Sequence, residues 1–178
     1  VSISNTALRE YHLPAFKAAI DKGASSIMLN SGLVNGVPGH SNIDFVTKLL
    51  KEELGFEGVV VTDWADIANL YGRDRIASSP KEAIKIAINA GVDISMEPYD
   101  YQAYCRDLVA LVREGEVAQS RIDDAVRRIL NLKYKLGLFN WKDHGSRTGY
   151  AAVGTAKADT LSYNGASEAI TLLKNEYD

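Results

Sequence analysis

Apolar residues recur at mixed three- and four-residue intervals along several stretches of the chain, a spacing that predicts helices with one buried face. The first stretch spans 6–22, and Gly23 is suited to end it. The other stretches with this spacing span 44–54, 80–90, 101–113 and 120–136. Pro80 fits the first turn of its helix, and Ser120 is the expected N-cap of the last one.

Short runs of β-branched and other apolar residues lie between these helices and predict strands. They span 25–30, 58–62 and 91–96, and the second run is the clearest because it contains three consecutive valines. Strands that alternate with helices indicate right-handed βαβ units around a parallel sheet. Period-two alternation predicts that Val59 and Val61 pack on one face and Val60 on the other.

The helical pattern weakens past Phe139. Residues 143–165 are rich in Gly, Ser, Thr and Asp and contain few large apolar side chains. We therefore predict one α/β unit over 1–139 and an interdomain linker over 140–165. Apolar spacing returns at Ile170, Leu172 and Leu173, so residues 166–175 are predicted to be helical and 166–178 to begin a second domain.

Composition narrows the classes of partner. The chain of 178 residues has 20 Lys plus Arg against 23 Asp plus Glu, and its net charge of -3 offers no broad basic field to nucleic acid or to a membrane. The single cysteine, Cys105, excludes an internal disulfide and lacks the spacing of a zinc site, so we expect it to be buried in its helix. The first residues show neither an initiator methionine nor a signal-peptide pattern, which indicates a piece of a longer chain.

Candidate functional side chains follow each predicted strand at its carboxyl end, namely Asn30-Ser31, Asp63-Trp64 and Met96-Glu97. Parallel α/β proteins bind ligands at this edge, so we expect Ser31, Asp63 and Met96 to lie on one rim. A carboxylate beside a tryptophan suits sugar chemistry, because an ionised Asp can attack an anomeric carbon while an indole packs on the C–H face of a pyranose. The competing interpretation makes Asp63 the N-cap of the helix after it.

Four segments, in this order, resemble the family 3 glycoside hydrolases. LREYHLPAFKAAI at 8–20 is similar to the helix before the sixth barrel strand of that family. NGVP with His40, followed by LLKEELGFEGVVVTDW at 49–64, is similar to the stretch that ends in its nucleophile. RIDDAVRRIL and KLGLF, within 121–139, resemble its last barrel helix, and AITLLKN at 169–175 resembles the start of its second domain.

This resemblance implies a fold and an activity. Residues 1–139 would form the last three βα units of a (β/α)8 barrel, too few to close it alone, and the chain would end at the start of a second α/β domain. The implied reaction is retaining hydrolysis of terminal β-linked glucose, with Asp63 as nucleophile and with Trp64 and Met28 near the sugar. The family implies no cofactor and no metal. The expected partners are a β-glucoside or oligosaccharide and the remainder of the polypeptide or a complementary chain.

The chain departs from the family at Ser31, where a tyrosine is frequent, so this serine either contacts the sugar or is an ordinary loop residue. His40 is interpreted as ordering its loop, and Asp66 and Glu97 as structural residues. The acid that protonates the leaving group is expected outside these residues. The alternatives are a β-N-acetylhexosaminidase or β-xylosidase of the same family, or a non-catalytic sugar-binding or assembly half-barrel. If the source is bacterial, a periplasmic or extracellular location is favoured over a cytoplasmic one.

Overall fold

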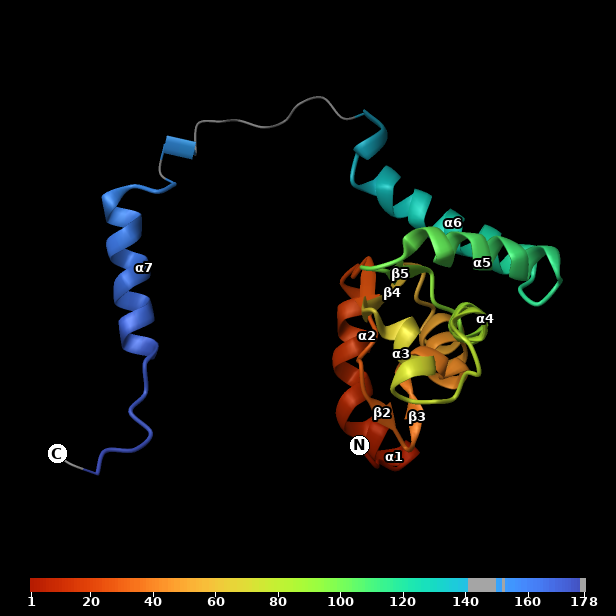
Figure 1. Cartoon of the computed structure of the whole chain (residues 1–178), viewed down its shortest axis with the longest axis horizontal. Coiled ribbons are helices and arrows are strands. Elements are labelled where there is room, and N and C mark those ends of the chain that lie inside the picture. Colours follow the sequence, from red (N-terminus) through yellow and green to blue (C-terminus); the bar gives the residue numbers. More distant parts are fainter. Residues whose placement is uncertain (141–149, 152, 177–178) are drawn as a thin grey trace. The chain divides into compact units, whose positions relative to one another are not determined.

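The computed structural model describes residues 1–140, 150–151 and 153–176. The chain divides into two compact units, Val1–Phe139 and Asn140–Asp178. The first unit contains a parallel sheet of three strands, β1 (Ser26–Met28), β4 (Val59–Trp64) and β5 (Ile94–Met96), in the order β1-β4-β5 (Figure 1). The predicted mixed α/β class with a parallel sheet is therefore confirmed.

Helices precede, connect and follow these strands. The first helical segment consists of α1 (Asn5–Ala7), η1 (Leu8–His12) and α2 (Leu13–Asp21). The connections contain η2 (Gly39–Ser41), η3 (Asp44–Glu53), α3 (Asp66–Gly72) and α4 (Pro80–Ala90). After β5 come α5 (Tyr101–Arg113), α6 (Gln119–Lys135) and η4 (Leu138–Asn140). Among the described residues, no helix combines the length and apolar character needed to span a bilayer.

The strands differ in extent from their predicted bounds. The sequence placed Asp63 directly after the second strand. In the structure β4 continues to Trp64, so Asp63 lies inside the strand. β1 and β5 are shorter than predicted, and Gly91, whose φ is 115°, ends α4 instead of opening a strand. Residues 31–42 are rich in Gly and Asn, which predicts a loop, but this segment holds an antiparallel hairpin of β2 (Leu33–Val34) and β3 (Val37–Pro38).

Further local predictions were wrong. Helix α6 begins at Gln119 with Ala118 at the N-cap, so Ser120 lies inside the first turn and does not cap it. Cys105 is exposed on α5, where the structure buries Leu111 instead.

The second unit contains α7 (Ala156–Ala169), which begins within the predicted linker and ends early in the segment predicted to be helical. Thr155 caps α7 by accepting a hydrogen bond from the N–H of Ala158 at 3.2 Å, and residues 170–175 are not helical. The part of the predicted linker at 141–149 and 152 lies outside the described residues.

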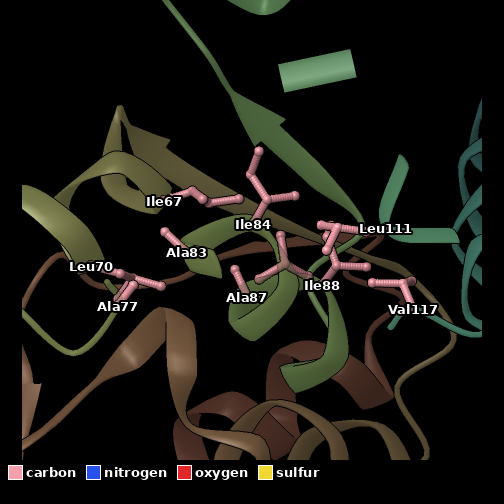
Figure 2. Close-up of a cluster of buried hydrophobic side chains, with 10 residues drawn as sticks. Ile67, Leu70, Ala77, Ala83, Ile84, Ala87, Ile88, Leu111 and Val117 are labelled. Atoms are coloured by element: carbon pink, nitrogen blue, oxygen red, sulfur yellow. The ribbon is translucent and has the colours of Figure 1, made fainter. Parts of the chain in front are cut away.

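Two apolar clusters form the core of the first unit. Val60 packs with Val46, Leu50 and Phe56, which places η3 against one face of the sheet. The second cluster joins α3 to α4 and reaches Leu111 and Val117 (Figure 2). Because Ile67 and Leu70 are buried in this cluster, it fixes the helix that follows the end of β4.

A cluster of charged side chains holds the amino-terminal ends of β4 and β5. Asp93 is bound by Lys51 and Arg121. Arg128 donates through Nη1 to the carbonyl oxygens of Phe56 at 2.7 Å and Gly58 at 3.0 Å. Burial alone would raise the pKa of Asp124, but hydrogen bonds from Arg127, Arg128 and Arg121 outweigh it and hold that pKa well below its usual range. This charged cluster holds α6 and η3 against the sheet at the edge opposite the carboxyl ends of the strands.

Candidate active site

The carboxyl ends of the three strands lie at one edge of the sheet. Met28 is paired with Val61 in β1 and β4, and Trp64 is paired with Met96 in β4 and β5. The N–H of Met96 donates to Oγ1 of Thr62 at 2.8 Å, and the N–H of Ala65 donates to the carbonyl oxygen of Met96 at 3.0 Å. Asp63 and Met96 therefore lie on one rim, and the hydrogen bond of Ser31 to Asp66, just beyond β4, places Ser31 there too, as predicted.

Asp63 occupies the next-to-last position of β4 and is partly exposed. Its Oδ1 accepts a hydrogen bond from the N–H of Trp64 at 2.7 Å, and within the described part of the chain its Oδ2 takes no hydrogen bond. The N-cap of α3 is Ala65, with φ of 56° and no side-chain cap. Asp63 is therefore not the cap of the following helix.

Two large side chains beside Asp63 are open to solvent. Trp64 is 63% exposed and Met28 is 50% exposed. Exposed apolar surface next to a carboxylate is the arrangement expected of a sugar subsite, since an indole can cover the C–H face of a pyranose. Neither residue belongs to the buried clusters of the first unit.

The hydroxyl of Ser31 is engaged within the protein. It donates to Oδ1 of Asp66 at 2.7 Å and accepts from Nη1 of Arg73 at 3.0 Å. Arg73 also binds Asp74 through Nε at 2.8 Å. Ser31 is thus part of a hydrogen-bonded group and not an unspecialised loop residue. The sequence offered no signal for Arg73, which lies in a polar stretch and whose role depends on contacts distant in sequence.

His40 and Asp66 are both almost fully buried, and Nε2 of His40 lies 3.6 Å from Oδ2 of Asp66. Burial lowers the pKa of His40, although the negative charges of Asp66 and Asp63 act in the opposite direction. Their interpretation as structural residues from sequence is consistent with this burial. Glu97 accepts a hydrogen bond from the N–H of Tyr99 at 3.4 Å and so helps to shape the turn after β5.

Other features of the first unit contribute little to this site. Burial raises the pKa of Tyr104, on α5, to about 12, so its phenol is a poor base at neutral pH. A hollow of about 420 Å³ is lined by Arg9, Asn42 and Phe45 among others, and Asp63 does not line it. Among the residues that the structure describes, no group of three or more His, Cys, Asp or Glu side chains could hold a metal ion.

The chain is similar to known carbohydrate-active proteins. The model of the glycosyl hydrolase family 3 N-terminal domain matches residues 1–132. The lysosomal beta glucosidase of Dictyostelium discoideum is 46% identical over 171 residues, which make up 95% of this chain and 21% of that protein. A putative beta-xylosidase of Formosa agariphila is 35% identical over 99% of this chain and 23% of its own length.

Solved structures show the same relationship. The beta-glucosidase from Listeria innocua matches with a TM-score of 0.77 and 32% identity, over 98% of this chain and 24% of that one. The exo-1,3/1,4-beta-glucanase from a Pseudoalteromonas species matches with a TM-score of 0.74 and 32% identity, over 98% of this chain and 22% of that one. The chain thus spans only 21% to 24% of the length of these proteins.

Proposed function

Since the chain belongs to glycosyl hydrolase family 3, we propose that it carries the nucleophile of a retaining, exo-acting β-glycosidase and that this nucleophile is Asp63. The observation that carries the proposal is the position of Asp63 at the carboxyl end of a parallel strand, with one carboxylate oxygen without a hydrogen bond among the described residues and an exposed tryptophan beside it.

The proposed reaction is retaining hydrolysis with Asp63 as the nucleophile. Oδ2 of Asp63 attacks the anomeric carbon of the terminal sugar as the glycosidic bond breaks, and an acid protonates the departing oxygen. Water then hydrolyses the glycosyl ester, and two inversions give net retention. In retaining enzymes, the second carboxyl group lies about 5–5.5 Å from the nucleophile. We expect this acid to come from a part of the enzyme outside these residues.

We further propose that residues 1–139 form the last three βα units of a (β/α)8 barrel, that 140–165 connect it to a second domain and that this domain begins at 166–178. The order of the parallel strands β1-β4-β5 follows the order of the chain, as in a barrel. The relatives are several times longer than this chain, which supports completion by further barrel strands. The remainder of the polypeptide or a complementary chain would supply them.

The proposed substrate is a terminal β-linked glucose, with Trp64 and Met28 beside the sugar and Ser31 at the rim. Similarity to proteins named beta-glucosidase favours glucose. Similarity to proteins named beta-xylosidase makes a β-xyloside the second candidate. Assays with p-nitrophenyl β-glucoside and β-xyloside distinguish the two by their kcat/KM values.

A mechanism-based inhibitor tests the nucleophile. In the full-length enzyme, a 2-deoxy-2-fluoro glucoside should leave the sugar esterified to the peptide that contains Asp63. Asp63→Ala should lower kcat by several orders of magnitude while the protein stays folded and binds a non-hydrolysable glucoside analogue. Glu97→Gln, a carboxylate change at the same edge, is the matched control. A label on Glu97 or Asp66 would contradict the assignment.

A further inference from the structure

A buried histidine–carboxylate pair adjoins the strand end that carries Asp63. His40, on η2, and Asp66, the first residue of α3, are each 1% exposed. Their facing atoms, Nε2 and Oδ2, are 3.6 Å apart, beyond the usual hydrogen-bond range of about 2.7–3.2 Å. Within the part of the chain that the structure describes, neither atom has a hydrogen-bond partner. Buried polar atoms are nearly always paired, so this gap requires an explanation.

The other carboxylate oxygen of Asp66 is firmly held. Oδ1 accepts from Oγ of Ser31 at 2.7 Å and from Nδ2 of Asn69 at 2.6 Å. Arg73 in turn donates to Ser31 at 3.0 Å. Ser31, in the segment after β1, and Asn69, in α3, therefore hold one oxygen of the Asp66 carboxylate. The second oxygen is directed towards His40. Burial favours the neutral imidazole at this position by lowering the pKa of His40, and a neutral imidazole has one N–H to donate.

Asp66 is connected to Asp63 by a short and constrained piece of backbone. Ala65, between them, has a left-handed φ of 56°, and its N–H is bound to the carbonyl oxygen of Met96 at 3.0 Å. The N–H of Trp64 is bound by the Asp63 side chain itself. Asp63 and Asp66 are thus joined by two residues whose backbone N–H groups are both bound. An error of about 1 Å in the position of a reacting group can lower a rate by about a hundredfold.

We propose that His40 and Asp66 form a positioning pair that aims Asp63 at the anomeric carbon, an inference that rests on the proposed role of Asp63 as nucleophile. His40 closes the 3.6 Å gap and donates its Nε2 proton to Oδ2 of Asp66. Asp66 then has both oxygens bound, and the turn that leads back to Asp63 has one orientation. Neither residue contacts the sugar.

The experiment compares four variants of the full-length enzyme. His40→Leu removes the donor while filling much of the space, and His40→Gln keeps an N–H donor at a similar distance. Asn69→Ala removes a donor to the other oxygen from a partly exposed position and so tests the same carboxylate with less risk to folding. His12→Leu, at an exposed histidine on η1, is the matched control. The readouts are kcat, KM, the burst rate of glycosyl-enzyme formation and the melting temperature.

We expect His40→Leu to lower kcat and the burst rate by about ten- to a hundredfold with KM within about threefold of wild type. His40→Gln should keep most of the wild-type kcat and burst rate, and Asn69→Ala should lower kcat several-fold. His12→Leu should leave kcat, KM, the burst rate and the melting temperature unchanged. A lower melting temperature with normal kcat in the His40 and Asn69 variants would overturn the proposal, as would a raised KM with normal kcat. If Asp63→Ala stays active, the proposed function fails as well; if it is inactive and His40→Leu is normal, only this inference fails.

Discussion

Asp93 and Val60 are joined by two hydrogen bonds: the N–H of Asp93 donates to the carbonyl oxygen of Val60, and the N–H of Val60 donates to Oδ2 of Asp93, both at 2.9 Å. A side chain thus continues the pairing of β4 with β5 beyond the strand itself. The remaining oxygen of Asp93 binds Lys51 at 2.8 Å. The backbone register and the buried charges at this edge therefore depend on one carboxylate.

Asp93→Ala should destabilise the protein by about 3–5 kcal/mol, because it leaves the buried Lys51 without its main partner and the N–H of Val60 without an acceptor. Thermal melting of the full-length protein measures the loss. Asp21→Ala is the control, since Asp21 pairs with Lys17 in an exposed i,i+4 arrangement and should change the melting temperature little. Equal melting temperatures for the two variants would contradict the structural role of Asp93.

The stability contributed by Lys51 should depend on pH. Burial lowers the pKa of Lys51 to about 8, against the pull of Asp93 and with help from the nearby Arg121 and Arg128. Between pH 8 and the ordinary value of 10.5, the unfolded chain binds this proton while the folded one has released it. Stability therefore rises with pH across this window and is flat for this group below it.

The measurement for Lys51 is the difference in melting temperature between wild type and Lys51→Met at several pH values. The melting temperature of wild type should rise relative to that of Lys51→Met as the pH rises from 8 towards 10.5. Lys17→Met, at an exposed position, provides the baseline. A difference that does not vary with pH would show that Lys51 titrates normally.

Stability should depend on which residue occupies position 65, because residues with a branched β-carbon rarely adopt the φ of 56° found there. Ala65→Val is expected to cost about 1–2 kcal/mol of stability and to lower kcat, since this turn leads from Asp63 to α3. Ala65→Gly should preserve the turn and keep both stability and kcat near wild type. A Val variant with wild-type melting and turnover would show that the left-handed turn is not needed.

If Trp64 covers the sugar as proposed, Trp64→Ala should raise KM for a β-glucoside about tenfold, because that indole surface is lost. The melting temperature should change little, since the side chain is 63% exposed. Tyr134→Ala, at a 72% exposed aromatic residue of α6, is the control and should leave KM unchanged. If Trp64→Ala binds and hydrolyses the glucoside normally, Trp64 is not part of the subsite.

The sequence predicts Asp63 at the carboxyl edge of the sheet, although β4 extends one residue beyond it. A run of valines predicts a buried strand, and parallel strands present their carboxyl ends at a common edge. An Asn-Gly pair signals a hairpin turn, and Asn35 and Gly36 both have positive φ in the β2–β3 hairpin, where only a loop was predicted. Helix α7 was not predicted, because the segment 143–165 is rich in polar residues and was interpreted as a linker. Its signal was Thr155, an N-cap residue placed before an alanine-rich segment.

The surroundings of Asp63 could not be predicted in the same way. Ser31 and Asp66 are separated by 35 positions, and Arg73 and Ser31 by 42. Nothing in the local pattern indicates that these side chains share hydrogen bonds, because the contacts depend on how β1 and α3 are placed by the sheet. The burial of Asp66 and the exposure of Cys105 likewise depend on tertiary packing.

The bond from Arg128 to the carbonyl oxygen of Gly58 has a consequence for the order in which the molecule is made. These residues are 70 positions apart, and ribosomes add about 5–20 residues per second. The strand that carries Asp63 is made several seconds before the arginine that binds the residues just ahead of it. Until α6 has been translated, the carbonyl oxygen of Gly58 has water in place of this donor, whereas both strands that pair with β4 are complete once Met96 has been made.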